Sequence, residues 1–351
     1  MPAYKDAVRG TWYVSCYYKD WTGKRKVKKH RGLETKREAL AWEREFLTKS
    51  AGSPDMTFAT LFEVYFDDMT ARLRKLTCYN IESIVHRHIL PFLGSMPINR
   101  ITPAIIRQWQ QEIMAKNFTP PVNRVIHGRL SAILNYAVRY YGLPSNPCTI
   151  AGAIGSLKSG SMRFWTLEEF NRFLPHVKKP APRLGFELLF WGGLRFSELQ
   201  ALTPGDVDFD AGTISITKGY HLIRGESVIA GTKTLRSTRT IPLPAPIMGH
   251  LREYVNKLYD CSPEDRLFTA CNTVYRDAIK RACKETGIDR IRVHDLRHSH
   301  ASLLIDMDVP IMMVAERLGH EDVKTTMGTY GHLYQSRRDD TIAKLNALAG
   351  G

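Results

Sequence analysis

The sequence predicts a multidomain chain that is mainly α-helical, with small β-sheets near its start and in its C-terminal half. The 351 residues are enough for two or three domains. Long stretches carry apolar residues at helical spacing, whereas the stretches rich in β-forming residues are short. Segments rich in Gly, Pro and Ser at 51–54 and 143–160 separate three parts. We therefore expect domains at residues 1–50, 57–150 and 160–351.

Residues 1–50 are predicted to form an α+β module. Residues 11–18 are nearly all β-forming, a turn follows at 21–23, and residues 24–33 give a second strand. Thr35 opens a Thr-Lys-Arg-Glu sequence, which has the spacing of a capping box and starts a helix. This order predicts a short sheet with one helix on its back.

The second predicted strand is strongly basic. Six of the eight residues from 24 to 31 are Lys or Arg, and Tyr17, Tyr18 and Trp21 flank them. A basic strand face of this kind suits a sheet laid into a DNA groove, and a solvated charged face is the alternative. The candidate DNA-binding residues are Lys24, Arg25, Lys26, Lys28, Lys29 and Arg31.

Net charge and composition limit the kinds of partner. The formal net charge is +15, which favours nucleic acid before a membrane surface; a basic protein without a polyanionic partner is the alternative. No apolar run is long enough to span a bilayer, and no signal-peptide core is present. None of the six cysteines forms a Cys-x-x-Cys pair, so we expect reduced thiols, with neither a zinc ribbon nor a disulfide framework.

Residues 57–150 are predicted to form a four-helix domain. Apolar residues at helical spacing mark one helix at 57–75 and a second across 81–89. A Thr-Pro pair at 102–103 suits the start of a third helix, and the fourth runs from about Pro121 to Tyr141. The apolar stripes are most simply core, and the sequence leaves open whether the basic residues face DNA or solvent.

The C-terminal part is predicted to mix helices and strands. A Thr-Leu-Glu-Glu capping box at 166–169 opens it. β-forming residues predict strands at 214–217 and 239–243. Helical patterns are found near 166–175, 182–191, 195–202, 246–259, 272–286, 295–306, 310–318 and 322–330.

The strongest candidates for catalytic side chains lie near the C-terminus, where His294, Arg297, His320 and Tyr330 fall within 37 residues. An arginine fork matches phosphate oxygens. Histidine can donate a hydrogen bond or carry a proton near neutral pH, and tyrosine can act as a covalent nucleophile. The set favours a site that holds a phosphodiester and attacks it with a tyrosine.

Two earlier motifs add charge to this set. Arg195 follows a Gly-Gly pair, and Glu198 lies one helical turn further on, where it could orient the guanidinium. A surface ion pair of little value is the alternative. Lys233 falls between two β segments, where a turn can place its charge at a scissile group.

A zinc site is the rival hypothesis for the same region. His294 and His298 are four apart, which is a zinc-ligand spacing on a helix. The zinc-protease motif needs Glu directly after the first His, and Asp295 stands there instead. We therefore expect no metal, and we expect His298, His300 and His332 to be surface or structural residues.

Five motifs in this order together resemble the tyrosine recombinases, or phage-type integrases. They are Gly-Leu-Arg-x-x-Glu-Leu at 193–199, Thr-Lys-Thr-x-x-Ser-x-Arg-x-Ile-Pro-Leu at 232–243, His-Asp-Leu-Arg-His at 294–298, Leu-Gly-His at 318–320 and Thr-Tyr at 329–330. The resemblance extends to residues 57–150, which look like the family's SAM-like core-binding domain, and to residues 1–50, which resemble an arm-type DNA-binding module.

The resemblance implies a role for each site residue. Tyr330 would form a 3′-phosphotyrosyl bond to DNA, and Arg195 and Arg297 would clamp the phosphate oxygens. The remaining roles would be general acid for Lys233, general base or hydrogen-bond partner of Tyr330 for His294, phosphate contact for His320, and positioning of Arg195 for Glu198. No metal or nucleotide cofactor is implied, because the phosphotyrosine conserves the energy of the cleaved bond.

The resemblance also implies partners and a place of action. We expect double-stranded DNA with core and arm attachment sites, a homotetramer on that DNA, a directionality or bending factor, and no membrane. The place would be the cytoplasm of a bacterial host, at the nucleoid. The predicted function is integration and excision of a phage or mobile element. The alternatives are a type IB topoisomerase-like relaxing enzyme and a DNA-binding regulator without chemistry.

Overall fold

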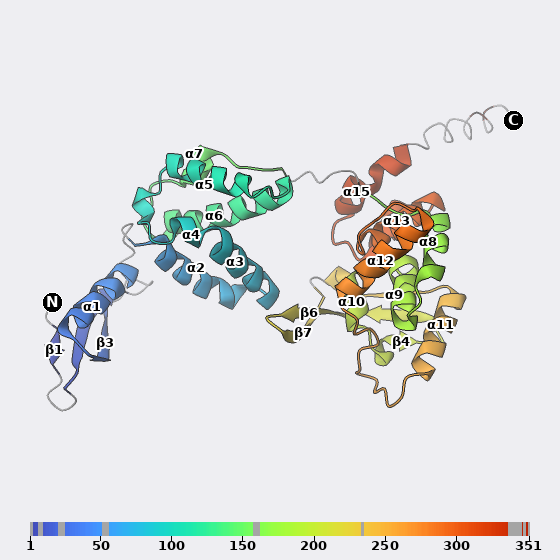
Figure 1. Cartoon of the computed structure of the whole chain (residues 1–351), viewed down its shortest axis with the longest axis horizontal. Coiled ribbons are helices and arrows are strands. Elements are labelled where there is room, and N and C mark those ends of the chain that lie inside the picture. Colours follow the sequence, from blue (N-terminus) through green and yellow to red (C-terminus); the bar gives the residue numbers. More distant parts are fainter. Residues whose placement is uncertain are drawn as a thin grey trace. The chain divides into compact units, whose positions relative to one another are not determined.

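The computed structural model describes residues 3–5, 10–19, 25–50, 56–156, 162–232 and 235–335, together with residues 346 and 349. The chain divides into two compact units, residues 1–160 and 161–351 (Figure 1). Among the described residues no helix is long and apolar enough to cross a membrane. All six cysteines are free thiols, and Cys16, Cys78 and Cys148 are buried.

The N-terminal module is the predicted sheet with one helix. Strands β1 (Tyr4–Lys5), β2 (Trp12–Lys19) and β3 (Arg25–Leu33) form an antiparallel sheet in that order. Helix α1 (Lys36–Ser50) packs on it over a small core of Ala3, Val14, Leu33 and Ala39. The Thr35 hydroxyl accepts a hydrogen bond from Glu38 N at 3.1 Å, so Thr35 caps α1 as expected.

The basic residues of β3 do not share one face, because side chains alternate along a strand. Lys29 and Arg31 lie opposite Ser15 and Tyr13, and both cations lie over the Tyr13 ring. Lys28 instead lies opposite the buried Cys16. The expectation of a single basic face is therefore wrong in this detail. Lys24 and Trp21 lie outside the described residues, as do the side chains of Tyr18, Arg25 and Lys26.

The four predicted helices of the next part are present as α2 (Phe58–Arg72), α3 (Lys75–His88), α5 (Pro103–Ala115) and α6 (Pro120–Tyr140). Thr57 and Thr102 are the N-caps of α2 and α5, since each side chain accepts a backbone N–H three residues on. The short α4 (Leu90–Leu93) and η1 (Ile98–Arg100) complete the connection. The helices enclose one apolar core with Trp109 at 0% exposure.

The segment expected to be a linker from 143 to 160 belongs largely to this core. It contains helix α7 (Pro147–Ala151), and Leu143, Cys148 and Ile154 are buried in the same cluster as α2–α6. Asn146 holds this segment on α6. Its side-chain oxygen caps α7 by accepting from Cys148 N, and its side-chain nitrogen donates to Ser131 O and Asn135 Oδ1 on α6. Proline and asparagine favoured a loop in the sequence, but here they start a helix as N1 and N-cap.

The hydrogen bonds of Asn146 predict that this segment stabilises the helical core. Replacing Asn146 with Ala removes the cap and three donated bonds from a 6% exposed side chain, which should cost about 1–3 kcal/mol. Asn146→Asp keeps the cap acceptor but turns a carboxylate oxygen toward Ser131 O and Asn135 Oδ1, so it should cost at least as much. Thermal unfolding of the full chain measures both. Equal midpoints for Asn146→Ala and the unchanged chain would show that the segment is a mere linker.

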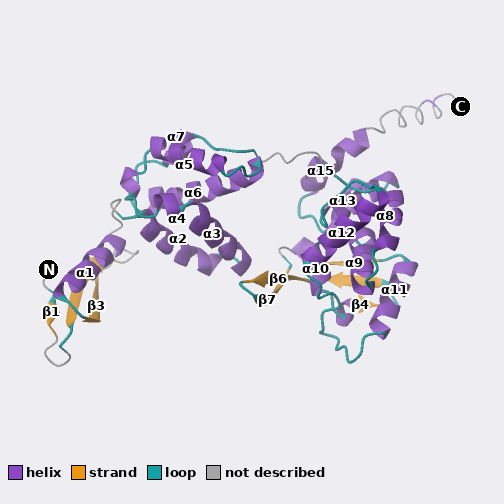
Figure 2. Ribbon diagram, in the orientation of Figure 1, coloured by secondary structure: helices purple, strands orange, loops and turns teal. Residues whose placement is uncertain are grey.

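The second unit combines helices with two small sheets (Figure 2). Its main helices are α8 (Leu167–Phe173), α9 (Pro180–Trp191), α10 (Phe196–Ala201), α11 (Ala245–Asn256), α12 (Asn272–Thr286), α13 (Asp295–Asp306), α14 (Ile311–Leu318) and α15 (Val323–Gln335). The short turns are η2 (Leu174–His176), η3 (Pro204–Asp206) and η4 (Leu235–Ser237). Thr166 and Glu169 form the predicted capping box of α8.

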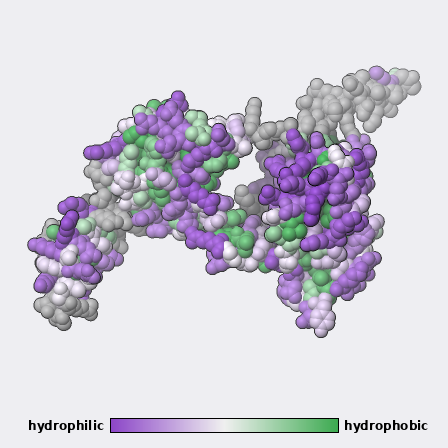
Figure 3. All heavy atoms as spheres, viewed as in Figure 1, coloured by the Kyte–Doolittle hydropathy of each residue, from purple (hydrophilic) through white to green (hydrophobic). Residues whose placement is uncertain are grey.

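The strands of this unit include a hairpin that the sequence did not specify. Strands β4 (Val207–Asp208), β5 (Thr213–Ile216) and β8 (Arg239–Pro242) form an antiparallel sheet, and β6 (Lys218–Ile223) pairs with β7 (Glu226–Gly231). Leu222 and Ile229 of the hairpin are exposed, and Figure 3 shows hydrophobic atoms where β6 and β7 lie. The main core is elsewhere, around the buried α9, where Phe170 and Phe190 stack at 3.9 Å.

Candidate active site

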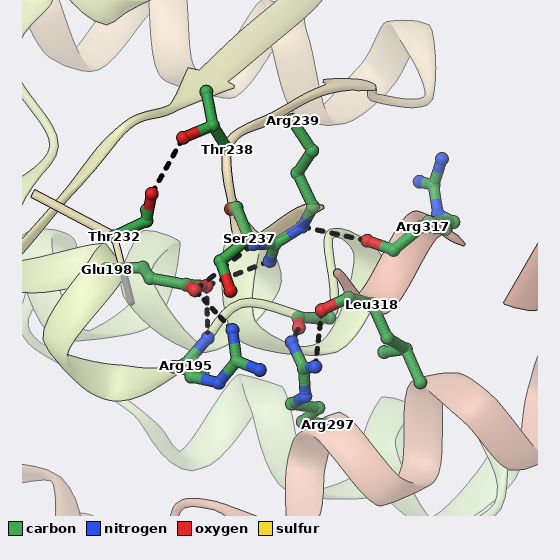
Figure 4. Close-up of polar contacts among 10 residues, drawn as sticks. Arg195, Glu198, Thr232, Ser237, Thr238, Arg239, Arg297, Arg317 and Leu318 are labelled. Carbon is green, nitrogen blue, oxygen red and sulfur yellow. Dashed lines mark hydrogen bonds and ion pairs between the residues drawn. The ribbon is translucent and has the colours of Figure 1, made fainter. Parts of the chain in front are cut away.

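The candidate site is assembled from four separate parts of the second unit (Figure 4). Arg195 is the N-cap of α10, and Glu198 lies in the first turn of that helix. Arg239 begins β8. Arg297 lies in the first turn of α13, and Leu318 ends α14. The polar contacts between these residues hold the helix ends and the sheet edge together.

Glu198 is the centre of the contacts. Its Oε1 accepts from Arg195 Nη1 at 2.7 Å, and its Oε2 accepts from the Arg195 backbone N–H at 2.8 Å. The Arg239 guanidinium donates to both oxygens, at 3.1 and 2.8 Å. Burial would raise the pKa of this carboxyl, but Arg239 and then Arg195 lower it to about 2. Glu198 is therefore ionised and held between two cations.

The two arginines differ in exposure. The Arg239 side chain is 6% exposed and that of Arg195 is 34% exposed. Arg239 also donates to Arg317 O at 2.9 Å and Ser237 O at 3.2 Å, so protein acceptors surround its guanidinium. Arg195 is thus the cation that can reach an external anion, and Arg239 is part of its support. The sequence alone gave Arg239 no role, because only the fold joins it to Glu198, 41 residues away.

Arg297 is buried and fixed by backbone carbonyls. Its Nη1 donates to Gly193 O at 2.8 Å, and its Nη2 donates to Leu318 O. Gly193 has φ of 62°, and a Cβ there would lie 2.5 Å from His300 Cδ2, so only glycine fits. Burial and then Arg195 lower the pKa of Arg297 to about 9, which leaves it charged at neutral pH.

Tyr330 is enclosed in the same region. It is 1% exposed and packs with apolar residues of α13 and α14, among them Ile305 and Leu318. Burial raises the pKa of Tyr330 to about 12, although the nearby Arg297 lowers it. The phenol therefore keeps its proton at neutral pH. It becomes a nucleophile only when a base takes that proton or a substrate brings further polarisation.

The hydrogen-bond partner of the Tyr330 hydroxyl is His298 and not His294, while a general-base role for His294 stays a prediction. His298 Nδ1 lies 2.6 Å from Tyr330 Oη. The His294 side chain is partly exposed to solvent, and its ring meets His298 edge-on at 5.4 Å between centroids. Both histidines lie at the start of α13, so their order in the motif could not show which one α15 would meet. His298 was expected to be a surface or structural residue.

His320 has one ring nitrogen occupied. Its Nδ1 lies 2.7 Å from Thr326 Oγ1, and Thr326 is 0% exposed. Partial burial and the cations Arg297 and Arg195 lower the pKa of His320 to about 4, and partial burial followed by His298 lowers that of His294 to about 4. Both rings are neutral at pH 7. When Thr326 donates to Nδ1, the proton of His320 is on Nε2, which can then donate to an anion.

Lys233 lies outside the described residues. Thr232, directly before it, and Thr238, beyond η4, are joined by a hydrogen bond between their hydroxyls at 2.7 Å. No group of three or more His, Cys, Asp or Glu among the described residues is arranged to hold a metal ion.

Three family models match this chain. The phage integrase family matches residues 163–337, an arm DNA-binding domain matches residues 2–50, and the phage integrase N-terminal SAM-like domain matches residues 57–114. The chain belongs to the phage integrase family. It is a site-specific tyrosine recombinase of the integrase type, and DNA is its partner.

Curated relatives of this integrase cover most of its length. The ICEBs1 integrase of Bacillus subtilis (strain 168) is 29% identical over an alignment of 357 positions, which covers 95% of this chain and 96% of that protein. The integrase of Mycobacterium phage D29 is 27% identical, and the match covers 75% of this chain and 72% of that integrase.

Solved structures share the fold of this integrase. The Tn1549 transposon integrase in complex with circular intermediate DNA has a TM-score of 0.69 at 18% identity, over 84% of this chain and all of that one. The lambda integrase tetramer bound to a Holliday junction has a TM-score of 0.59 at 18% identity, over 93% of this chain and 94% of that one.

The Glu198–Arg239 pair predicts a strong energetic coupling. Arg239→Met leaves a buried carboxylate with one cation fewer and should destabilise the second unit by about 3–5 kcal/mol. Glu198→Gln combined with Arg239→Met should cost clearly less than the sum of the two single changes. Urea unfolding of the four proteins measures the coupling, and the exposed Lys257–Glu253 pair of the same unit is the control, with an expected coupling below about 1 kcal/mol.

The same pair sets a pH dependence. Because the folded pKa of Glu198 is about 2 and its ordinary value is 4.5, its ionisation stabilises the fold above pH 4.5. The advantage of the unchanged protein over Glu198→Gln should be lost as the pH falls from about 4.5 to about 2. An advantage that is independent of pH over this range would contradict the ion pair.

Proposed function

We propose that this chain is the integrase of a mobile element, and that it cuts and rejoins DNA through a 3′-phosphotyrosine at Tyr330. One observation carries the proposal: Tyr330 shares an apolar cluster with Leu318, and the carbonyl of Leu318 accepts a hydrogen bond from Arg297, whose charge lowers the pKa of the phenol. A nucleophile close to a fixed guanidinium group suits attack on a phosphodiester, whose charge increases in the transition state.

The two arginines bind the scissile phosphate in this mechanism. Arg195 presents its outer donors to the non-bridging oxygens, because Glu198 occupies its inner side. Gly193 O and Leu318 O each accept from one terminal nitrogen of Arg297, which fixes the guanidinium, and its charge and remaining N–H groups would act on the phosphate. Preorganised charge of this kind stabilises a pentacovalent phosphate without reorganisation during the reaction.

His320, Lys233 and His294 complete the proposed set. His320 donates from Nε2 to a phosphate oxygen, an orientation that the Thr326 contact at Nδ1 supports. Lys233 is proposed to protonate the leaving 5′-oxygen, a role that rests on its place in the family motif. His294 lies at the exposed rim beside His298, where it can contact the phosphate or the DNA.

The proposed partners follow from the domains. We propose the division 1–50, 57–150 and 160–351, with the second domain extended to residue 156 because Ile154 is buried in its core and Ser156 N donates to Pro120 O. The N-terminal module would bind arm sites, and the other domains would bind core sites. A homotetramer is proposed for strand exchange, supported by the shared fold with the lambda integrase tetramer. A directionality or bending factor is part of the same proposal.

Tyr330→Phe tests the chemistry. It removes the attacking oxygen but keeps the ring in its apolar surroundings, so DNA binding should persist while covalent adducts disappear. The measurement is adduct formation on a nicked suicide substrate taken from the ends of the element. An adduct formed by Tyr330→Phe at the normal rate would reject Tyr330 as the nucleophile.

The alternation along β3 predicts which of its cations bind DNA. Lys29→Ala and Arg31→Ala should each weaken DNA binding by the full chain and lower its salt slope by about one, because one phosphate then has no protein cation. Lys28→Ala, on the opposite side of the same strand, is the matched control and should change the slope less. A larger effect at Lys28 than at Lys29 or Arg31 would show that the other face of the sheet meets DNA.

A further inference from the structure

The contact between His298 and Tyr330 is not used by the mechanism above. The two residues come from different helices, α13 and α15, and the Nδ1–Oη separation is 2.6 Å. This distance is at the short end of the hydrogen-bond range. Among the described side chains, His298 is the one that touches the proposed attacking atom through a hydrogen bond.

Given the function proposed above, we propose that His298 positions the Tyr330 hydroxyl and accepts its proton during DNA cleavage. The Oη lone pair forms the new bond to the scissile phosphorus while the bond from phosphorus to O5′ breaks. The Oη proton passes to Nδ1 of His298. The leaving O5′ takes its proton from a separate acid, the role proposed for Lys233. In rejoining, the 5′-hydroxyl attacks and His298 returns the proton to Oη.

The protonation states of the pair suit this transfer. Burial lowers the pKa of His298 and raises that of Tyr330 to about 12, so at rest the ring is neutral and the phenol holds its proton. The hydroxyl then donates, and Nδ1 accepts. His298 thus has the free lone pair that a general base needs, at hydrogen-bond distance from the proton it would take.

The charges around His298 act in both directions on the protonation of its ring. Asp295, buried at the start of α13, favours a positive ring, whereas Arg292 and Arg297 oppose it. Asp295 is itself held by Arg292, through Nη2 at 2.8 Å and the backbone N–H at 2.8 Å. A ring in this setting can carry a proton briefly without a fixed ion pair that would hold it permanently.

The backbone of α13 fixes the ring in place. Ser299, which follows His298, donates from Oγ to Asp295 O at 3.1 Å and accepts from Trp165 N at 2.9 Å. Arg297, which precedes it, is bound to Gly193 O and Leu318 O. His298 therefore stands between two anchored residues, and its half-buried side chain is directed to Tyr330.

The test uses the full-length protein and single-turnover cleavage of a suicide substrate. His298→Ala should slow adduct formation by about 10²-fold or more, with DNA affinity unchanged. His298→Asn keeps an acceptor near Nδ1 but cannot take a proton, so it should also be slow. His176→Ala, at a partly exposed histidine paired with Glu285, is the matched control and should cleave normally.

One change to the nucleophile and one change to the substrate distinguish a general-base role of His298 from a general-acid role and from a purely structural role. Fluorinated tyrosine at position 330 is a stronger acid, so it should restore much of the rate of His298→Ala. A 5′-bridging sulfur, which leaves without protonation, should rescue Lys233→Ala and leave His298→Ala slow.

Three results would overturn the inference while leaving the recombinase assignment intact. They are a His298→Ala rate within about threefold of the unchanged protein, rescue of His298→Ala by the sulfur substrate, and no rescue by fluorinated tyrosine. Failure of the unchanged protein to form any adduct would overturn the proposed function, and the inference with it.

Discussion

The catalytic unit depends on one buried carboxylate. Glu198 binds Arg195 from its own helix and Arg239 from the sheet edge, and Arg239 then reaches Arg317 O at the end of α14. Without Glu198, two guanidinium groups and the nearby Arg297 would share a poorly solvated region with no anion among them. The carboxylate makes it possible to place several cations close together before a phosphate arrives.

A second constraint is the enclosure of the nucleophile. Tyr330 contributes its ring to the apolar contacts between α13, α14 and α15, so the residue that would react also stabilises the fold. Enclosure keeps the phenol protonated and links its reactivity to a histidine on a neighbouring helix. Chemistry and packing are joined at this residue, and a change that loosens α15 should affect both.

The sequence predicted contacts between residues close together in the chain. It missed contacts that depend on how separate helices and strands pack against one another. Arg195 and Glu198 are three residues apart on one helical turn, so their contact followed from spacing. Arg239 belongs to the motif at 232–243, but its partner, Glu198, is 41 residues away. The sequence could not decide whether His294 or His298 meets the Tyr330 hydroxyl, because one helical turn brings both near the site and only the approach of α15 decides. Likewise, Pro147 and Asn146 indicated a linker until their packing on α6 was known.

The amino-acid sequence by itself determined the family, the mainly α-helical class with small sheets, and the set of residues able to bind and attack a phosphodiester, because these follow from residue chemistry and short-range spacing. Only the tertiary structure decided which histidine meets Tyr330, which arginine supports Glu198, and which β3 cations share a face with Tyr13. Those choices depend on contacts between elements distant in sequence, and a list of residues does not contain the direction in which each element presents its side chains.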